Sequence, residues 1–277
     1  MNGGRNTDWL LCARGLDFRG DLFEVKRLTA EEVGSLFKSH GRNLVYIRNI
    51  YDFDCAEKTA FWYVVRDKAI EIDDYPSKKD RQQIRRSLKA YDIKKVDIKE
   101  MGRVGYQVFY ENWLRFPEDH RPKLESKEAF ESYLQVQVAR GVEFWVGYSA
   151  ETGEAAMWEA VYVTGNMAVE ERERLSYRYK QHYPTYGLNH VIANYYLQER
   201  GVRYVVAGAR TATEHSNVQE FLLKKMGFRK AYCKLKVWFR FPFNLIVPCA
   251  YPFRKLLPRG SNLRSLLMLV QYSKTSQ

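Results

Sequence analysis

The amino-acid sequence predicts an α/β fold, in which helices flank a mixed β-sheet. Two observations lead to this prediction. From residue 94 onward, strand-like and helix-like runs follow one another in the order β, α, α, β, β, β, α, β, α, β. The composition is that of a globular protein, because 45% of the 277 residues are hydrophobic and 28% are charged. Such an order favours one sheet that is covered by helices.

The first 90 or so residues contain strand-like runs among loops and two helix-like segments. The second helix-like segment is strongly basic. The predicted strands are 44–50, 60–67 and 69–75, and the predicted helices are 29–38 and 78–92.

The middle of the chain begins with a strand at 94–101 and continues with helices at 105–116 and 127–141. The second of these helices is expected to stop at Gly141, because glycine readily adopts the left-handed conformation that ends a helix.

The last part of the pattern starts with three strand-like runs, and a glycine-containing turn, ETGE, separates the first two. A helix begins near Pro184 and Thr185, residues that commonly start helices, and it shows helical apolar spacing from Leu188. The N-terminus of such a helix can bind an anion. The remaining predicted elements are strands 142–150, 155–163, 166–176, 203–209 and 229–240 and a helix at 216–226.

The composition excludes several classes of protein, among them membrane-spanning and disulfide-rich secreted proteins. The apolar stretch 241–253 is too short to span a bilayer, and the N-terminal residues lack the apolar run of a signal peptide. We therefore expect a cytoplasmic protein. Four widely spaced cysteines and five scattered histidines predict neither disulfides nor a metal site.

The net charge of +12 is concentrated in one part of the chain. Residues 201–277 contain 14 Lys and Arg but only two acidic residues, whereas the first 200 residues are balanced. This asymmetry favours an anionic partner, such as nucleotide phosphates, tRNA or an acidic membrane surface. A solvated basic face would explain it equally well.

The stretch NVQEFLLKKMGFRKAYCKL, together with the strand and helix order, resembles the GNAT acyltransferase superfamily over residues 92–240. Its helix stops at Gly227, and Phe228 follows at once. The upstream segments RQQIRRSLK and ENWLRF resemble the Fem-type aminoacyltransferases and related cell-envelope and polysaccharide acyltransferases. The resemblance implies a reduced GNAT-like unit over residues 1–91, a GNAT-like core over 92–240, and a basic and apolar extension over 241–277.

Two positions depart from the pattern of that superfamily. Members that use acetyl-CoA carry a glycine-rich turn before the first helix of the core, whereas this chain has QHYPTY at 181–186. Gln181 fits that pattern, but Pro184 lacks an N–H and Tyr186 is bulky. Leu223 stands where many members have a tyrosine acid. By resemblance, Gln181 and Tyr186 remain the residues expected to contact the donor.

Three residues are candidates for catalysis, because acyl transfer to an amine needs a base. Glu159 lies on the apolar face of its predicted strand, where burial would raise its pKa. The alternatives for Glu159 are a partner arginine or a bulge that turns it to solvent. Glu171 lies in the run EERER and His190 on the polar side of its helix, and both could equally be ordinary surface residues.

The loop GARTATEHSN at 208–217 follows a buried strand, where α/β folds commonly bind ligands. Helix capping would explain part of this loop without a ligand. The residues of the loop that we expect at a donor or substrate site are Arg210, His215, Ser216 and Asn217.

A second basic group, Arg81, Arg85 and Arg86, is spaced to share one helix face and predicts contact with an anionic substrate. The alternative is a solvated face. The tail after residue 240 mixes aromatic residues, prolines and cations, which favours peripheral contact with an anionic membrane. It could instead wrap the core and bury its own apolar residues.

The resemblance implies an acyltransferase that moves an acyl or aminoacyl group from an activated donor to an amine on a sugar or peptide precursor of the cell envelope. Acyl-CoA is the first donor to consider, and no metal is expected. Two alternatives stay open: a non-catalytic binding protein of GNAT fold, and a transferase that uses aminoacyl-tRNA. The partners are then a small-molecule donor and an amine acceptor, and the sequence leaves the oligomeric state open.

Overall fold

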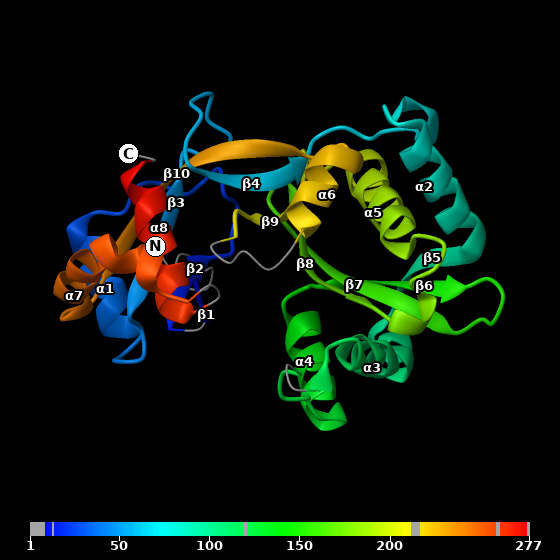
Figure 1. Ribbon diagram of the computed structural model, residues 1–277, viewed down its shortest axis with the longest axis horizontal. Coiled ribbons are helices and arrows are strands. Elements are labelled where there is room, and N and C mark those ends of the chain that lie inside the picture. The colour runs from blue at the N-terminus through cyan, green and yellow to red at the C-terminus, as the bar shows by residue number, and fades with distance from the viewer. Residues whose placement is uncertain (1–8, 13, 119–120, 212–216, 259–260, 276–277) are drawn as a thin grey trace. The chain divides into compact units, whose positions relative to one another are not determined.

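The computed structural model describes residues 9–12, 14–118, 121–211, 217–258 and 261–275 (Figure 1). The chain forms two compact units, and it passes between them inside β4 (Phe61–Arg66), β9 (Tyr204–Ala209), α6 (Val218–Lys225) and β10 (Arg229–Phe239). The first unit comprises Met1–Val64, Ala209–Gln219 and Lys230–Gln277, and the second comprises Val65–Gly208 and Glu220–Arg229.

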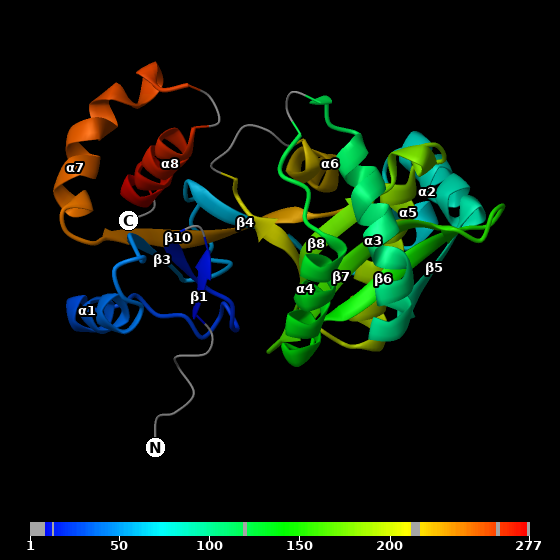
Figure 2. The same cartoon turned by 90° about the horizontal axis from the view of Figure 1, so that it is seen from below.

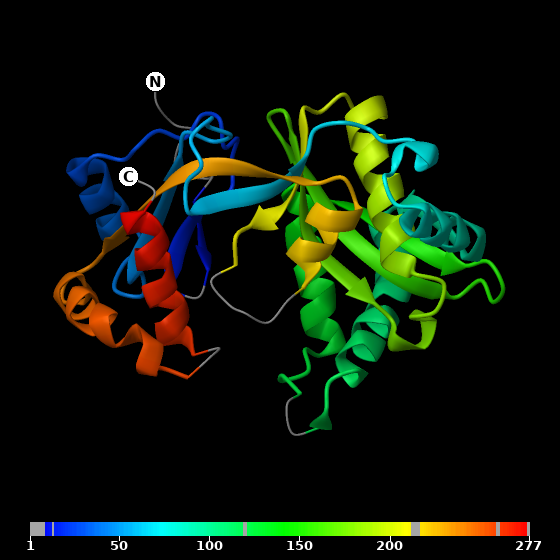
Figure 3. The same ribbon diagram turned by 45° about the horizontal axis from the view of Figure 1, so that its top comes forward.

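In the first unit the strands lie in the order β1-β2-β3-β10-β4. β2 runs parallel to β3, and β10 runs antiparallel to β3. Figure 3 shows the long strand β10 beside β4. The other elements of this unit are β1 (Trp9–Cys12), β2 (Gly15–Phe18), α1 (Ala30–Ser39), β3 (Tyr46–Tyr51), β10 (Arg229–Phe239), α7 (Phe243–Ala250), a 3-10 helix (Tyr251–Leu256) and α8 (Asn262–Lys274).

In the second unit the strands lie in the order β9-β8-β7-β6-β5, and every described pairing among them is antiparallel except that of β8 with β9. The strands are β5 (Tyr91–Val96), β6 (Glu143–Ser149), β7 (Ala155–Thr164) and β8 (Met167–Leu175). The helices are α2 (Lys78–Ala90), α3 (Ile98–Leu114), α4 (Lys127–Ala139), α5 (Pro184–Asn194) and α6 (Val218–Lys225), with short 3-10 or π segments at Ile72–Asp74, Tyr177–Tyr179 and Tyr195–Glu199.

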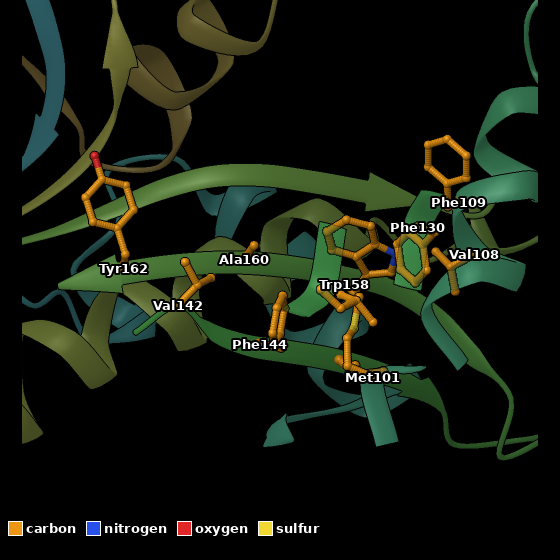
Figure 4. Close-up of a cluster of buried hydrophobic side chains, with 11 residues drawn as sticks. Met101, Val108, Phe109, Phe130, Val142, Phe144, Trp158, Ala160 and Tyr162 are labelled. Carbon is orange, nitrogen blue, oxygen red and sulfur yellow. The ribbon is translucent and has the colours of Figure 1, made fainter. Parts of the chain in front are cut away.

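Helices cover both faces of this second sheet, α3 and α4 on one face and α2 and α5 on the other (Figure 1). The face under α3 and α4 holds an aromatic core that includes Phe130, Phe144 and Trp158 (Figure 4). Trp158 is fully buried, and its indole N–H donates to the Gly105 carbonyl of α3 at 3.0 Å. Trp158, Ala160 and Tyr162 of β7 therefore lie in this core. The alternate side chains of β7, such as Glu159, face the side of the sheet that α5 covers.

The predicted α/β fold with a mixed sheet is confirmed, and most elements lie close to their predicted ranges. Gly227 has a φ of +72° and ends α6 as predicted. The tail forms two helices, α7 and α8, which the sequence pattern did not reveal, and the same holds for β1 and β2. The three-part organisation proposed from the resemblance stays a prediction.

Two predicted segments were wrong. Residues 69–75 do not form a strand, because the Asn194 side chain bonds both the N–H and the carbonyl of Ile70, at 3.1 Å each, in place of a neighbouring strand. The strand predicted at 94–101 ends at Val96 instead. Asp97 then caps α3, and its carboxylate accepts a hydrogen bond from the Glu100 N–H at 2.8 Å.

Candidate active site

A β-bulge places three glutamates on one face of the second sheet. Glu173 pairs with Glu159 across β8 and β7, and Glu170 pairs with Val161. Glu171 is the extra residue of the bulge. Strict alternation would turn Glu170 and Glu173 to opposite faces, because they are three positions apart. Because the bulge adds one residue between them, Glu170 and Glu173 point to the same face of the sheet as Glu159, the face that α5 covers.

We call Glu159, Glu170 and Glu173 the carboxyl cluster. Glu159 is only 2% exposed, and one carboxyl oxygen of Glu159 and one of Glu170 are buried without a hydrogen-bond partner. Burial and the neighbouring carboxyl groups raise the pKa of Glu159 well above its usual value. Burial, with the charge of Glu173, raises the pKa of Glu170 to about 8. The cluster therefore holds protons at neutral pH.

The cluster lies where β8 leaves its parallel neighbour. β8 pairs with β9 at only three positions, the last of which joins Val169 to Val206. Beyond Val169, the described partner of β8 is β7 alone. Glu170 and Glu173 follow this point and are half-buried, so solvent reaches them in part. Thr185, in the first turn of α5, donates to Glu173 at 3.3 Å.

Glu171, predicted as a catalytic candidate, is separated from the cluster. Its carboxylate pairs with Arg140 at the end of α4, at 3.0 Å. That contact lies on the side of the sheet that α4 covers. Glu171 thus forms an ion pair in place of the solvated position that was its alternative. Glu159 has neither of its own two alternatives within the described residues, because no arginine pairs with it and it is not turned to solvent.

His190 belongs to a buried network, so its expected exposure on the polar side of α5 was wrong. Its Nδ1 lies 3.1 Å from the Tyr75 hydroxyl, which in turn accepts from Arg66 at 3.1 Å. Arg66 is fully buried and also donates to Asn194 at 2.6 Å. Burial and the charge of Arg66 lower the pKa of His190 to about 4, so this imidazole is neutral at physiological pH.

The N-terminus of α5 is occupied by the chain itself. The Gly187 N–H donates to Ser87 Oγ of α2 at 3.1 Å, and the Tyr186 N–H donates to the Tyr183 carbonyl at 2.9 Å. A Cβ on Gly187 would lie 2.4 Å from Ser87 Oγ, so a glycine is required for this close approach. Of the N–H groups in the first turn of α5, those of Tyr186 and Gly187 are therefore already used, and Pro184 has none.

Tyr186 and Gln181, both expected at the donor site, take different positions. The Tyr186 hydroxyl donates to the buried Asp80 of α2 at 3.0 Å, and its ring meets Phe221 of α6 edge-on. Gln181 is exposed, and its carbonyl accepts from the Tyr91 hydroxyl at 2.7 Å. Tyr186 thus ties α5 to its neighbours, and only Gln181 remains at a surface.

A pocket of about 480 Å³ opens beside this turn and contains two cationic side chains, Arg86 and Lys89, that form no ion pair with a described residue. His182 lines it as well. Arg81 instead donates to the Tyr75 carbonyl, and Arg85 pairs with Asp73. The remaining lining residues are Ala90, Tyr91, Ser149, Ala150, Glu151, Arg178, Tyr179 and Gln181.

The loop at 208–217 is described only in part, because His215 and Ser216 lie outside the described residues. Arg210 donates to the Ala60 carbonyl, and its guanidinium stacks on the Tyr272 ring at 4.2 Å. Asn217 is exposed. Arg210 is thus held by its own unit, and its predicted role in donor binding stays a prediction.

The sequence analysis missed Glu170 and Glu173, although both lie in the run EERER. The feature of the sequence that could have identified them is the order of the two strands. The acidic strand comes directly after the strand on which Glu159 faces inward, and pairing of the two strands can bring their carboxyl groups together. No group of three or more His, Cys, Asp or Glu side chains in the described part of the chain is arranged to hold a metal ion.

Comparisons with known proteins agree with the fold. The chain superimposes on the crystal structure of FemX with a TM-score of 0.50 and 10% identity, over 78% of this chain and 71% of FemX. This likeness, below 25% identity, shows a shared fold, so the predicted resemblance to Fem-type proteins is confirmed at that level. No protein-family profile matches the chain, and no curated protein is significantly similar to it in sequence.

Two further structures are more distant. The C-terminal domain of a putative lysylphosphatidylglycerol synthetase from Agrobacterium fabrum is 16% identical, with a TM-score of 0.45 over 64% of this chain and 59% of that one. A tandem GNAT protein from the clavulanic acid pathway is 14% identical, with a TM-score of 0.44 over 76% and 67%.

The carboxyl cluster predicts an unusual pH dependence of stability. Because the pKa of Glu159 is higher in the folded than in the unfolded chain, folding takes up a proton, and wild-type stability falls as pH rises above the unfolded value of about 4.3. Glu159→Gln cannot ionise. Relative to wild type, we therefore expect the free energy of unfolding of this variant to rise progressively as pH increases above about 4.3.

Denaturant unfolding at a series of pH values measures this gain. Glu171→Gln is the matched control, because Glu171 is ion-paired outside the cluster, and it should show no such gain. Parallel stability curves for wild type and Glu159→Gln would contradict the raised pKa.

Proposed function

We propose that this protein is an acyltransferase that moves an acyl or aminoacyl group from an activated ester or thioester to an amine. The observation that carries the proposal is the carboxyl cluster, in which burial and the charge of Glu173 raise the pKa of Glu170 to about 8 just beyond the point where β8 ceases to pair with β9. A group with a pKa near the working pH is the most effective proton acceptor. The fold shared with FemX is compatible with this chemistry but does not establish it.

In the proposed reaction the amine nitrogen attacks the carbonyl carbon of the donor. The new C–N bond forms, the bond from carbonyl carbon to the leaving oxygen or sulfur breaks, and the amine proton passes to an ionised carboxylate of the cluster. That proton can then move to the leaving group. Glu159, which holds its proton most strongly, keeps the negative charge of the cluster low, and Glu170 is the group we assign as the base.

We further propose that the pocket beside the turn before α5 takes an anionic group of the acceptor, a sugar or peptide precursor of the cell envelope. Arg86 and Lys89 offer positive charge there and form no ion pair with a described residue, although Glu151 also lines the pocket. Thr185 follows three residues after His182 and contacts Glu173. A substrate phosphate in the pocket would therefore lie near the turn that also adjoins the cluster.

The donor is the least constrained part of the proposal. Ser87 fills the position at α5 where a CoA pyrophosphate would be expected, so that acyl-CoA in the usual pose would have to displace α2. Leu223 also supplies no acid for a thiolate. These two features favour an activated ester such as aminoacyl-tRNA, and they also support the second candidate function, a binding protein without catalysis.

A first prediction concerns the donor. Because the Tyr186 and Gly187 N–H groups are engaged and Pro184 has none, we expect acetyl-CoA and longer acyl-CoAs at millimolar concentration to leave the melting temperature within about 1 °C of that with no ligand. Any ligand that binds only the folded chain must raise it. A rise that grows with acyl-CoA concentration would show that α2 yields its place and would restore acyl-CoA as the donor.

A second prediction concerns the base. Glu170→Gln should lower kcat by roughly 10²- to 10⁴-fold, as expected for loss of a general base, with the donor that the melting experiments identify. In wild type, kcat/KM should rise with pH up to about 8, because Glu170 must lose its proton to act. Glu171→Gln is the control and should keep wild-type kcat. If no amine and donor pair gives turnover while ligands still bind, the non-catalytic reading stands.

A third prediction concerns the pocket. Arg86→Ala with Lys89→Ala should raise KM for a phosphorylated acceptor by about tenfold or more while kcat stays within about twofold, because these cations bind the acceptor at a distance from the base. Arg85→Ala, next in the chain but paired with Asp73, is the control. An unchanged KM would remove the pocket from the proposal.

A further inference from the structure

Exposed apolar side chains follow one another along the turn before α7, α7 itself and the 3-10 helix after it. Five side chains there are between 51% and 80% exposed. Together we call them the apolar ridge: Phe241, Leu245, Ile246, Phe253 and Leu256. Single exposed apolar residues are ordinary, but five within 16 positions of one segment are not.

The opposite face of α7 is already packed. Val247 is 1% exposed and lies in a small core with Leu267 and Val270 of α8. Figure 2 shows α7 beside α8. α7 is therefore apolar on both sides, and a helix of that kind is normally covered on both. Within the described residues nothing covers the apolar ridge.

The charge around the ridge has one sign. Residues 221–277 contain no acidic residue. Arg254 and Lys274 both lie over the Tyr251 ring at 4.2 Å, at the base of the ridge. A surface that joins exposed apolar side chains to cations complements a partner that is negative at its surface and apolar beneath it.

We propose that the apolar ridge docks the protein on the surface of an anionic lipid bilayer, with its apolar side chains in the interface and its cations at the headgroups. In the described part of the chain no helix is long and apolar enough to cross a membrane, so the contact is peripheral. A second copy of this chain is a poorer occupant, because it would bring two copies of a basic segment without acidic residues together. The proposal is independent of the acyl transfer proposed above.

The test is sedimentation of the full chain with vesicles of phosphatidylglycerol and phosphatidylcholine, against vesicles of phosphatidylcholine alone. We expect binding to the anionic vesicles that weakens as salt increases. Leu245→Ser, Ile246→Ser and Leu256→Ser together should weaken it at least about tenfold, since each removes apolar surface that would leave water.

Val136→Ser with Val138→Ser is the matched control, because both valines are exposed apolar residues but lie on α4. This variant should bind as wild type does. The double variant Arg254→Gln with Lys274→Gln tests the electrostatic contribution to vesicle binding. Its binding should depend less on salt concentration than that of wild type. These side chains are at least partly exposed, and an unchanged melting temperature checks that each variant is folded.

Three results would overturn the proposal. One is the absence of binding to anionic vesicles. Another is equal binding of wild type and the triple serine variant to them. The third is self-association of the lipid-free protein, seen by analytical ultracentrifugation and lost in the triple variant, which would assign the ridge to contacts between copies.

Discussion

The pairing of β7 with β8 depends on one extra residue, and the candidate site depends on that pairing. Glu171 is the additional residue on β8, and its carboxylate is held on the α4 side by Arg140. As a result Glu170 and Glu173 turn to the same face as Glu159. A single residue thus converts an ordinary charged strand into a cluster of three carboxyl groups, in keeping with the frequent use of bulges to re-aim side chains at functional sites.

Such a cluster costs stability, because burial and mutual repulsion both oppose ionisation. The opposite face of the same strands supplies the compensating interactions. Trp158 and its aromatic neighbours bury their surface under α3 and α4, where apolar burial is the main favourable term in folding. One face of the second sheet is therefore packed with apolar side chains. The other face carries glutamates whose pKa values are raised. Sites that sacrifice stability in this way are commonly functional.

Hydrogen bonds between distant segments hold the elements on the polar face of the second sheet in place. Ser87 engages the start of α5, Asp80 engages Tyr186, and Arg66 joins β4 to His190 and Asn194 through the network around Tyr75. These contacts hold α5 over the carboxyl cluster without any ligand. They fix the position of α5 and leave fewer free N–H groups at its N-terminus.

The sequence by itself determined what local patterns encode. Alternation on β7 put Glu159 on an inward face, Gly227 ended α6, and the order of strands and helices specified the fold class. Tertiary structure decided the rest. The bulge is a property of two paired strands, so neither strand alone predicts that Glu170 and Glu173 face the same side. Likewise Ser87 lies 100 residues from Gly187, and Asn194 lies 124 residues from Ile70. Hydrogen bonds between residues so far apart arise only when the chain is packed, because sequence spacing carries no record of which segments will meet.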